Sequence, residues 1–267
     1  MPRALEQIRR MRGGAQAQLM RCDDGHYYIV KFQNNPQAAA GGRVLVNDWL
    51  GTRLAARIGL PTPPVAVVDV SRDLIALTEE LVIQIGTGSV PCSSGPQFGS
   101  RYPGDPAHVA VHDFLPDMQM DTVENLADFA GALVLDKFLC NTNGRQAIFF
   151  RDPGRSNYTA TFIDHGFCFN AGEWSFPDAP LRGIYPRHRV YATVTSMKSF
   201  EPWLARVDRI TPSVLDEICR DIPPVWYADD QDALYGLLEQ IDRRRKKVPD
   251  LILEAKNSYR QPFFNWG

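Results

Sequence analysis

The chain has 267 residues, of which 44% are hydrophobic and 22% are charged, and its formal net charge is −2. This length suffices for one large domain or for two lobes that share a cleft, and the composition is that of an ordinary globular protein. A charge so close to zero provides no global attraction to nucleic acid or to an anionic membrane surface, so neither is expected as a partner.

The cysteines and the N-terminal residues indicate a compartment. Five cysteines are scattered along the chain without a Cys-x-x-Cys pair, which favours reduced thiols and argues against a zinc site. The first ten residues carry charge where a signal peptide needs an apolar run. The sequence also has no apolar stretch of about 18 residues, the length that spans a membrane. We therefore expect a cytoplasmic protein without a membrane-spanning helix.

The first third of the chain is predicted to contain a β-hairpin. Gly13 and Gly14 open a turn of small residues before a first strand at 16–21. The motif Asp23-Asp24-Gly25 is a strong turn signal, and a second strand rich in aromatic and β-branched residues follows at 26–32. A lobe that begins with strands is the expected result.

Lys31 lies within the second of these strands, on the same face as Ile29 and Gln33. A Lys in an apolar strand that follows a glycine-containing hairpin can reach the phosphates of a nucleotide under a flexible loop. Taken alone, the position is explained more simply by an edge-strand Lys in solvent.

A helix is predicted for residues 43–58, because its apolar residues recur on one face and Gly59 ends the pattern. Asn47 falls inside the apolar band and therefore needs a polar partner. Asp48 lies at the edge of the same face. It either pairs with Lys31, as a helix acid does with the phosphate-binding Lys of kinases, or faces solvent as an ordinary surface Asp.

The next part of the chain is predicted to contain more strands and then a loop. The strands are expected at 65–70, 74–78 and 79–85. Residues 86–106 hold many Gly, Ser and Pro residues, which predicts a long loop.

A helix is predicted for residues 122–140, with Asp136 on its buried side. A carboxylate there either anchors the following loop or serves as a catalytic group, and its place within the helix favours the anchor. Residues 141–146 form a short polar loop that leads into predicted strands at 148–151 and 159–163. A polar loop, a strand, a turn and a second strand are the layout of the catalytic hairpin in kinases.

The second strand of this hairpin delivers Asp164 into a turn made by Gly166. A strand that ends in Asp-x-Gly holds magnesium against a nucleotide phosphate in several phosphotransferases, and hard divalent cations prefer oxygen ligands. The tripeptide alone is a weak signal, since an Asp followed closely by Gly is usually just a turn. The signal is stronger because the tripeptide follows Lys31 and the polar loop in the order that kinases have.

The rest of the chain is predicted to be mainly helical. The helical segments are expected at 190–207, 212–219 and 229–248. The basic run 243–247 is interpreted as the solvated end of the last helix, with a phosphate- or nucleic-acid-binding patch as the alternative.

The order of elements predicts an α+β fold with two lobes and a cleft. We expect a β-rich N-terminal lobe over residues 1–115 and a mainly helical C-terminal lobe over residues 116–267, joined as one continuous domain.

These motifs, in this order, resemble the HipA-like branch of kinase-fold proteins over most of the chain. The resemblance is carried by Tyr28-Ile-Val-Lys-Phe32, Val46-Asn-Asp-Trp-Leu50, Asn141-Thr-Asn143 and Phe162-Ile-Asp-His-Gly166. It implies a two-lobed kinase-like fold that binds ATP and Mg²⁺ and transfers a phosphoryl group to the hydroxyl of a protein or a small molecule. The sequence does not identify this acceptor.

The resemblance also implies a nucleotide site. Lys31 would hold the phosphates, with Asp48 as its partner on the helix. Gly13 and Gly14 would give flexibility to the loop that covers the nucleotide.

For metal binding and catalysis, the resemblance implies that Asp164 and Asn141 hold the metal. Asn143 and Gln146 would line the catalytic loop near the acceptor, and Asp136 is a further catalytic candidate by its spacing from Asn141.

The catalytic loop departs from the family pattern. Asn143 stands where the family has Asp, Gln146 stands near the place of the metal-binding Asn, and the loop is shorter. An amide cannot accept a proton as a carboxylate does, so general-base help would be lost. The chain is therefore either a phosphotransferase with a degenerate loop or a pseudokinase that binds a nucleotide or a partner. A DNA-binding regulator is a third reading, disfavoured by the near-neutral charge.

Overall fold

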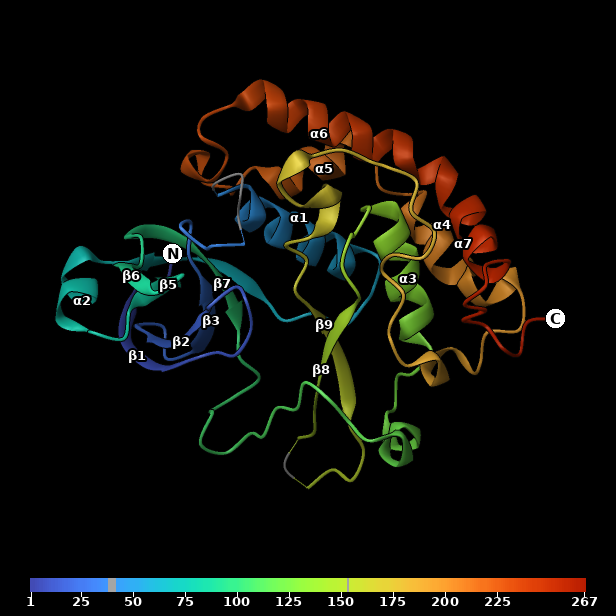
Figure 1. Ribbon diagram of the computed structural model, residues 1–267, viewed down its shortest axis with the longest axis horizontal. Coiled ribbons are helices and arrows are strands. Elements are labelled where there is room, and N and C mark those ends of the chain that lie inside the picture. Colours follow the sequence, from blue (N-terminus) through green and yellow to red (C-terminus); the bar gives the residue numbers. More distant parts are fainter. Residues whose placement is uncertain (38–41, 153) are drawn as a thin grey trace.

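A computed structural model describes residues 1–37, 42–152 and 154–267. A sheet-rich N-terminal part and a helical C-terminal part lie side by side, and a long hairpin runs between them (Figure 1). The N-terminal part is built on a five-stranded sheet. Its strands, in spatial order, are β1 (Ala4–Arg10), β2 (Gln18–Cys22), β3 (Tyr27–Lys31), β7 (Gly95–Arg101) and β4 (Val65–Val70).

The two faces of this sheet have different surroundings. Alternation along β3 places Tyr28 and Val30 on the outer face, in a small hydrophobic core. The elements that cover this core are α2 (Arg72–Leu77) and the hairpin of β5 (Val82–Ile85) and β6 (Gly88–Pro91). Ile29 and Lys31 lie on the opposite face, next to Ser100 and Phe98 of β7. That second face is turned toward the rest of the molecule.

Two predictions for this region are wrong. The segment 74–78 belongs to helix α2 and not to a strand, because the Ser71 hydroxyl accepts a hydrogen bond from Leu74 N at 3.1 Å and starts a helix. The segment 86–106 is not one long loop, since it contains β6 and the inner strand β7. Its loop-like composition has a packing cause: a Cβ at Gly99 would lie 2.4 Å from Val68 Cγ2.

The larger hydrophobic core joins helix α1 (Arg43–Arg57) to the C-terminal part. Trp49 of α1, for example, donates its indole N–H to Ile218 O at 2.9 Å. The remaining helices are α3 (Asp128–Phe138), α4 (Glu201–Val207), α5 (Pro212–Cys219), α6 (Gln231–Arg244) and α7 (Val248–Lys256). Short 3₁₀ segments are η1 (Asp117–Thr122), η2 (Cys168–Glu173), η3 (His188–Tyr191), η4 (Met197–Phe200), η5 (Pro224–Tyr227) and η6 (Arg245–Lys247).

Three helix predictions need correction. The helix expected at 122–140 begins only at Asp128, and that expected at 190–207 is reduced to η3, η4 and α4. The pattern at 229–248 is divided into α6 and η6 and continues as α7. The basic run 243–247 is not wholly solvated, since Arg244 is only 5% exposed. None of the helices in the described parts of the chain is long and apolar enough to cross a membrane.

The predicted hairpin is present as β8 (Gln146–Phe150) and β9 (Thr159–Ile163). Gln146 pairs with Ile163 at its open end, so the polar loop 141–146 and Asp164 meet there. This end of the hairpin lies beside α1 and α3 (Figure 1). The fold thus brings the residues singled out in the sequence toward one region between the two parts.

Candidate functional site

Lys31, Asp48 and Asp164 form a lysine–carboxylate cluster where β3, α1 and the end of β9 meet. The Lys31 ammonium donates to both carboxylate oxygens of Asp48, at 3.0 and 2.8 Å, and to Asp164 Oδ1 at 2.7 Å. Of the two alternatives for Asp48, the structure thus has the pairing with Lys31 and not an exposed surface Asp. The exposed fractions of the side chains are 11% for Lys31, 2% for Asp48 and 19% for Asp164, so Asp164 is the most accessible carboxylate of the cluster.

The charges in this cluster support one another. Burial alone would lower the pKa of the Lys31 ammonium, but the two carboxylates outweigh it and raise the pKa. Burial raises the pKa of Asp48 to about 6, against the pull of Lys31. For Asp164 the balance is reversed: burial is outweighed mainly by Lys31, and the pKa is lowered. Asp164 is therefore the carboxylate that retains its charge most firmly.

The backbone around Asp164 is shaped for close contact with α1. Asp164 itself has φ of 59°, in the left-handed region that non-glycine residues seldom adopt. The next residue, His165, donates its backbone N–H to Asp48 Oδ1 at 2.9 Å. A Cβ at Gly166 would lie 2.8 Å from Val44 Cγ1, so a side chain there would push the turn away from α1. Strained backbone of this kind is retained at functional sites more often than elsewhere.

Asn47 has the polar partners that its place in the apolar band requires. Its amide donates to the carbonyls of Gly166, Cys168 and Ala171 at 2.8–3.0 Å and accepts from the Trp174 indole at 2.9 Å. The residue next to Asp48 on α1 thus fixes the chain just beyond Asp164. The position of α1 and that of the Asp164 turn are consequently coupled.

Gln146 is the loop residue that reaches the lysine–carboxylate cluster. Its amide donates from Nε2 to Asp164 Oδ2 at 2.6 Å, and its side chain is exposed. Asn143 is also exposed, but its Oδ1 accepts from the backbone N–H of Gly144 at 2.8 Å and makes no contact with Asp164. The structure therefore brings Gln146, and not Asn143, to the carboxylate of Asp164.

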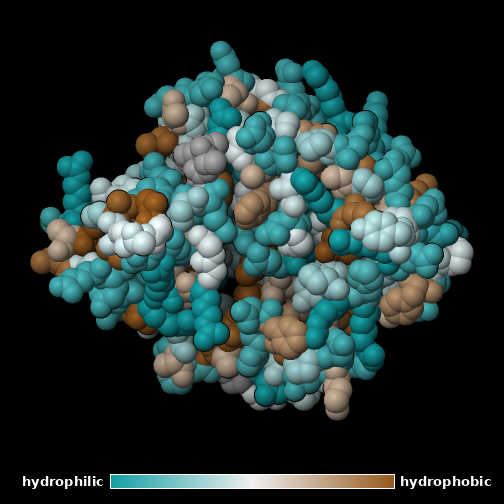
Figure 2. Space-filling model, in the orientation of Figure 1, coloured by the Kyte–Doolittle hydropathy of each residue, from teal (hydrophilic) through white to brown (hydrophobic). Residues whose placement is uncertain are grey.

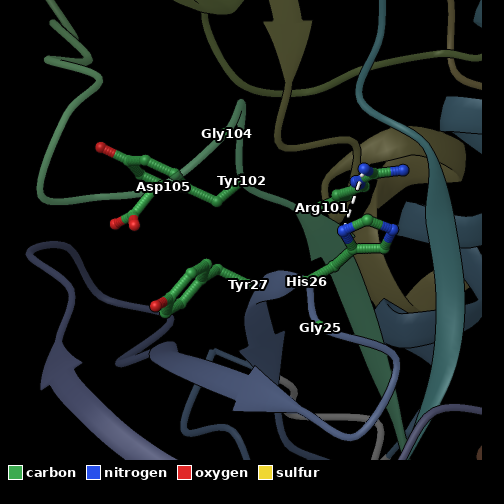
Figure 3. Close-up of a pocket in the computed structure, with 7 residues that line it drawn as sticks. All are labelled: Gly25, His26, Tyr27, Arg101, Tyr102, Gly104 and Asp105. Atoms are coloured by element: carbon green, nitrogen blue, oxygen red, sulfur yellow. Dashed lines mark hydrogen bonds between the residues drawn. The ribbon is translucent and has the colours of Figure 1, made fainter.

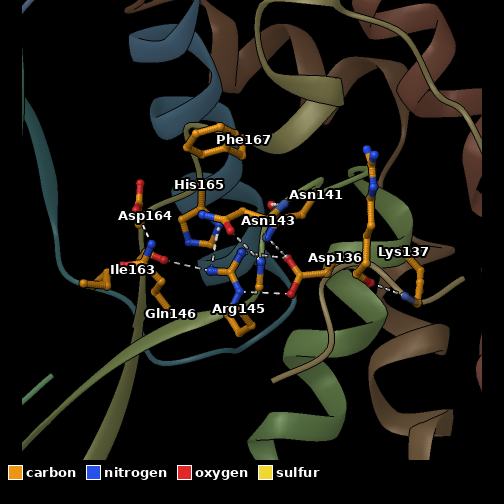
Figure 4. Close-up of polar contacts among 12 residues, drawn as sticks. Asp136, Lys137, Asn141, Asn143, Arg145, Gln146, Ile163, Asp164, His165 and Phe167 are labelled. Carbon is orange, nitrogen blue, oxygen red and sulfur yellow. Dashed lines mark hydrogen bonds and ion pairs between the residues drawn. The ribbon is translucent and has the colours of Figure 1, made fainter. Parts of the chain in front are cut away.

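Asp136 and Asn141 belong to a separate buried network (Figure 4). Arg145 donates to both oxygens of Asp136, at 2.9 and 2.7 Å, in an ion pair whose side chains are 1% and 0% exposed. Asn141 donates to Asp136 Oδ1 at 2.9 Å and accepts from Asn143 N at 3.0 Å. Arg145 also donates to Ile163 O at 2.8 Å, which ties the end of α3 to the end of β9.

Sequence reasoning missed Arg145 and His165. Arg145 lies in the polar loop and has no periodic signal of its own, although a buried Asp136 requires a cation nearby. His165 is fully buried against α1, where a Cβ at Gly51 would lie 2.4 Å from its own Cβ. The small residue at Gly51, inside a helix, was the one available signal for this close approach.

Gly13 and Gly14 lie in the turn between β1 and β2. Gly13 has φ of 111°, which side-chain-bearing residues rarely adopt. A Cβ at Gly14 would lie 2.3 Å from Gln37 Nε2. The turn thus contacts the segment that leads from β3 to α1.

A hollow of about 340 Å³ opens at the start of β3. Figure 3 shows the rings of Tyr27 and Tyr102 and the carboxylate of Asp105 on one side, and the contact between His26 and Arg101 on the other. The complete lining is Gly25, His26, Tyr27, Arg101, Tyr102, Gly104 and Asp105. Tyr27 shares its face of β3 with Lys31, four residues or roughly 13 Å further along. The space-filling view shows the surface hollowed between the two parts of the molecule (Figure 2).

A two-lobed fold with a Lys on an inner strand, an acid on the adjacent helix and an Asp at the end of a hairpin defines a kinase-like protein. The model of the HipA-like kinase family matches residues 5–250, so the chain belongs to the HipA-like kinase family. No curated protein matches the sequence.

Solved structures of kinases share this fold. The Helicobacter pylori proinflammatory kinase CtkA is 12% identical, with a TM-score of 0.54 over 91% of this chain and 92% of that one. The Golgi casein kinase is 11% identical, with a TM-score of 0.53 over 97% of this chain and 74% of that one. A structure of the same casein kinase has Mn/ADP bound and gives a TM-score of 0.51 at 10% identity, over 97% and 73%. At such identities the likeness establishes the fold alone.

Proposed function

We propose that this protein binds ATP with magnesium between its two lobes and transfers the terminal phosphoryl group to the hydroxyl of a protein or a small molecule. The observation that carries the proposal is Lys31, which contacts Asp48 and Asp164 at 2.7–3.0 Å across three separate elements. A phosphate-binding Lys, a helix acid and a metal-binding Asp are the parts that kinases assemble in this way.

The nucleotide would lie along the inner face of β3. Lys31 would hold the phosphates, and the half-buried Ile29 on the same face offers apolar surface to the base. The hollow that contains Tyr27 and Asp105 lies at the far end of this row, where the nucleoside end of the ligand would approach. The turn with Gly13 would cover the phosphates, since flexible backbone can donate N–H groups to them.

Asp164 and Gln146 are the residues that fit a magnesium ion. They offer a carboxylate and an amide carbonyl, the hard oxygen donors that this ion prefers, and both are accessible. Asn141 fits less well, because its Nδ2 donates to Asp136 of α3 and its Oδ1 accepts from Asn143 N in the loop. When bound, the ion would neutralise charge on the phosphates.

The acceptor side would work by positioning. Asn143 is exposed and can orient an acceptor hydroxyl by a hydrogen bond, but it cannot take up the proton. Asp136 cannot substitute as a base, because its side chain is 0% exposed and paired with Arg145. We therefore assign Asp136 to anchoring the loop. Phosphoryl transfer depends mainly on positioning and electrostatics, so a slow reaction is expected.

A pseudokinase that only binds the nucleotide is the second candidate. It is favoured by the loop 141–146, which has amides and no carboxylate in its sequence. The two candidates share the nucleotide site and differ in turnover alone. All five cysteines are free thiols, which supports a reducing compartment such as the cytoplasm for either function.

The binding test is a thermal-shift titration with ATP, with and without magnesium. We expect a stabilisation that requires the metal and is lost in Asp164→Ala, while Asp73→Ala on the exposed face of α2 retains it. The absence of a shift in the native protein under every condition would reject nucleotide binding.

The turnover test compares the native protein with Asn143→Asp, and uses Asn157→Asp in the exposed β8–β9 turn as the matched control. Restoring a carboxylate at residue 143 should raise ATP turnover by about 10²-fold, the usual contribution of a general base. A native turnover that already equals that of Asn143→Asp would contradict the degenerate loop. No turnover in either protein, with binding intact, would leave the pseudokinase as the function.

A further inference from the structure

The chain beyond Asp164 is held in place by side chains. Residues 174–183 contain neither helix nor strand. The backbone carbonyls of this segment therefore do not accept the regular hydrogen bonds of a helix or a sheet. They accept instead from side chains of α3 and α6. Lys137 donates to Pro180 O at 2.7 Å and to Arg182 O, and Arg244 donates to Phe176 O at 3.2 Å and to Pro177 O at 3.4 Å.

The two cations that make these contacts are buried. Lys137 is 2% exposed and Arg244 is 5% exposed, and a buried cation is costly unless polar groups compensate for its lost hydration. Arg244 has a carboxylate partner in Asp178, within the same segment. Lys137 depends on the carbonyls, because the neighbouring carboxylate of Asp136 is occupied by Arg145. Two buried cations, whose burial alone is unfavourable, thus both bind the segment 174–183.

The held segment ends on the loop that contains Asn143. Gly183 donates its backbone N–H to Asn143 O at 3.0 Å. A Cβ at Gly183 would lie 2.5 Å from Asp136 Cβ, so the backbone there rests directly on the end of α3. The position of residues 180–183 consequently determines where the loop of Asn143 can lie.

We propose that Lys137 and Arg244 form a clamp that fixes residues 174–183, and through Gly183 positions the acceptor side of the site. Its catalytic consequence depends on the proposed function; the clamp itself does not. The clamp orders this segment with side chains of α3 and α6.

The experiment compares Lys137→Met and Arg244→Met with the native protein. Lys246→Met is the matched control, since Lys246 is exposed and only two residues from Arg244. The first measurement is amide hydrogen exchange over residues 174–183 and at Gly183. Each clamp variant should speed exchange there by about tenfold or more, as the loss of charge-assisted hydrogen bonds predicts. The control should leave exchange unchanged.

The second measurement is ATP turnover. The clamp variants should lower kcat by about tenfold and leave the KM for ATP within about twofold, because the lysine–carboxylate cluster is not touched. A loss of general stability would instead speed exchange throughout the protein and alter both constants. Arg244→Lys retains the charge and should restore part of the protection in residues 174–183.

The outcomes separate the clamp from the proposed function. Exchange at residues 174–183 that stays native-like in both Met variants would overturn the clamp. Should either Met variant fail to fold, Asp178→Asn provides the test with a smaller change, because it removes the carboxylate partner of Arg244 within the segment. Native-like exchange in Asp178→Asn would again overturn the clamp. Faster local exchange in a protein without any ATP turnover would support the clamp and contradict the kinase reaction.

Discussion

The proposed nucleotide side and the proposed acceptor side of this site differ in how their charged groups are arranged. On the nucleotide side, Lys31 and two carboxylates lie in contact and Asp164 stays partly open to solvent, so charged groups remain available to a ligand. On the acceptor side, the ion pair of Asp136 and Arg145 is completely buried, and the exposed side chains of the loop 141–146 are the amides of Asn143 and Gln146. Binding and catalysis can therefore be lost or retained independently. This difference is why the fold alone does not decide between a kinase and a pseudokinase.

Among the substitutions considered, removal of Arg145 is expected to have the largest effect on stability. The variant Arg145→Met leaves Asp136 buried without its cation, which should cost about 3–5 kcal/mol of unfolding free energy. Urea denaturation at pH 7 measures this loss. The double variant Arg145→Met/Asp136→Leu should recover most of it, because an apolar pair of similar volume replaces the ion pair.

The same variants test whether Asp136 is an anchor or a catalytic group. If the double variant is stable and retains ATP turnover, Asp136 has no part in the chemistry. Turnover that disappears in a stable double variant with intact ATP binding would make Asp136 catalytic. That result would contradict the assignment of Asp136 as an anchor of the loop.

Lys137 gives the acceptor side a dependence of stability on pH in the alkaline range. Burial lowers the pKa of Lys137 to about 8 from its ordinary value of 10.5; Arg244 lowers it further, and Asp136 and Cys140 oppose the shift. Between these two values the unfolded chain binds more protons than the native one, so this group makes stability rise with pH. The contribution is lost as the pH falls through about 8. Its full size is on the order of 3 kcal/mol.

The difference in unfolding free energy between the native protein and Lys137→Met isolates this contribution. As the pH is raised from 7 to 10, the unfolding free energy of the native protein should increase relative to that of Lys137→Met. Measuring both proteins at each pH cancels the titration of the buried thiols. A difference that is independent of pH would show that the pKa of Lys137 is not lowered in the native protein.

Local patterns in the sequence were sufficient to predict β3, helix α1 and the hairpin of β8 and β9. They also offered the contact of Lys31 with Asp48 as one of two alternatives, because both residues lie in regular elements whose faces follow from periodicity. The family resemblance then gave the fold. These parts of the site were accessible because each depends on the order of a few residues within one element.

The rest depended on contacts between distant segments, which periodicity does not report. Gly99 looked like a loop residue and is a strand residue that packs under Val68. Arg244 looked like one of several solvated cations, but it is buried against carbonyls nearly seventy positions away in the chain. The pairing of Arg145 with Asp136 spans only nine positions, but it joins a loop to the preceding helix and so has no periodic signal either. Such compensation is visible only when the fold is known.

The smallest expected effect concerns the two glycines of the covering turn, and it tests the nucleotide side alone. Gly13→Ala places a side chain at φ of 111° and should cost about 1 kcal/mol. Gly14→Ala meets only the flexible end of Gln37 and should cost less than about 0.5 kcal/mol. If the turn covers the nucleotide, Gly13→Ala should also weaken ATP binding several-fold in the presence of magnesium, whereas Gly14→Ala should not. Equal ATP affinities in the two variants would mean that the turn does not cover the phosphates.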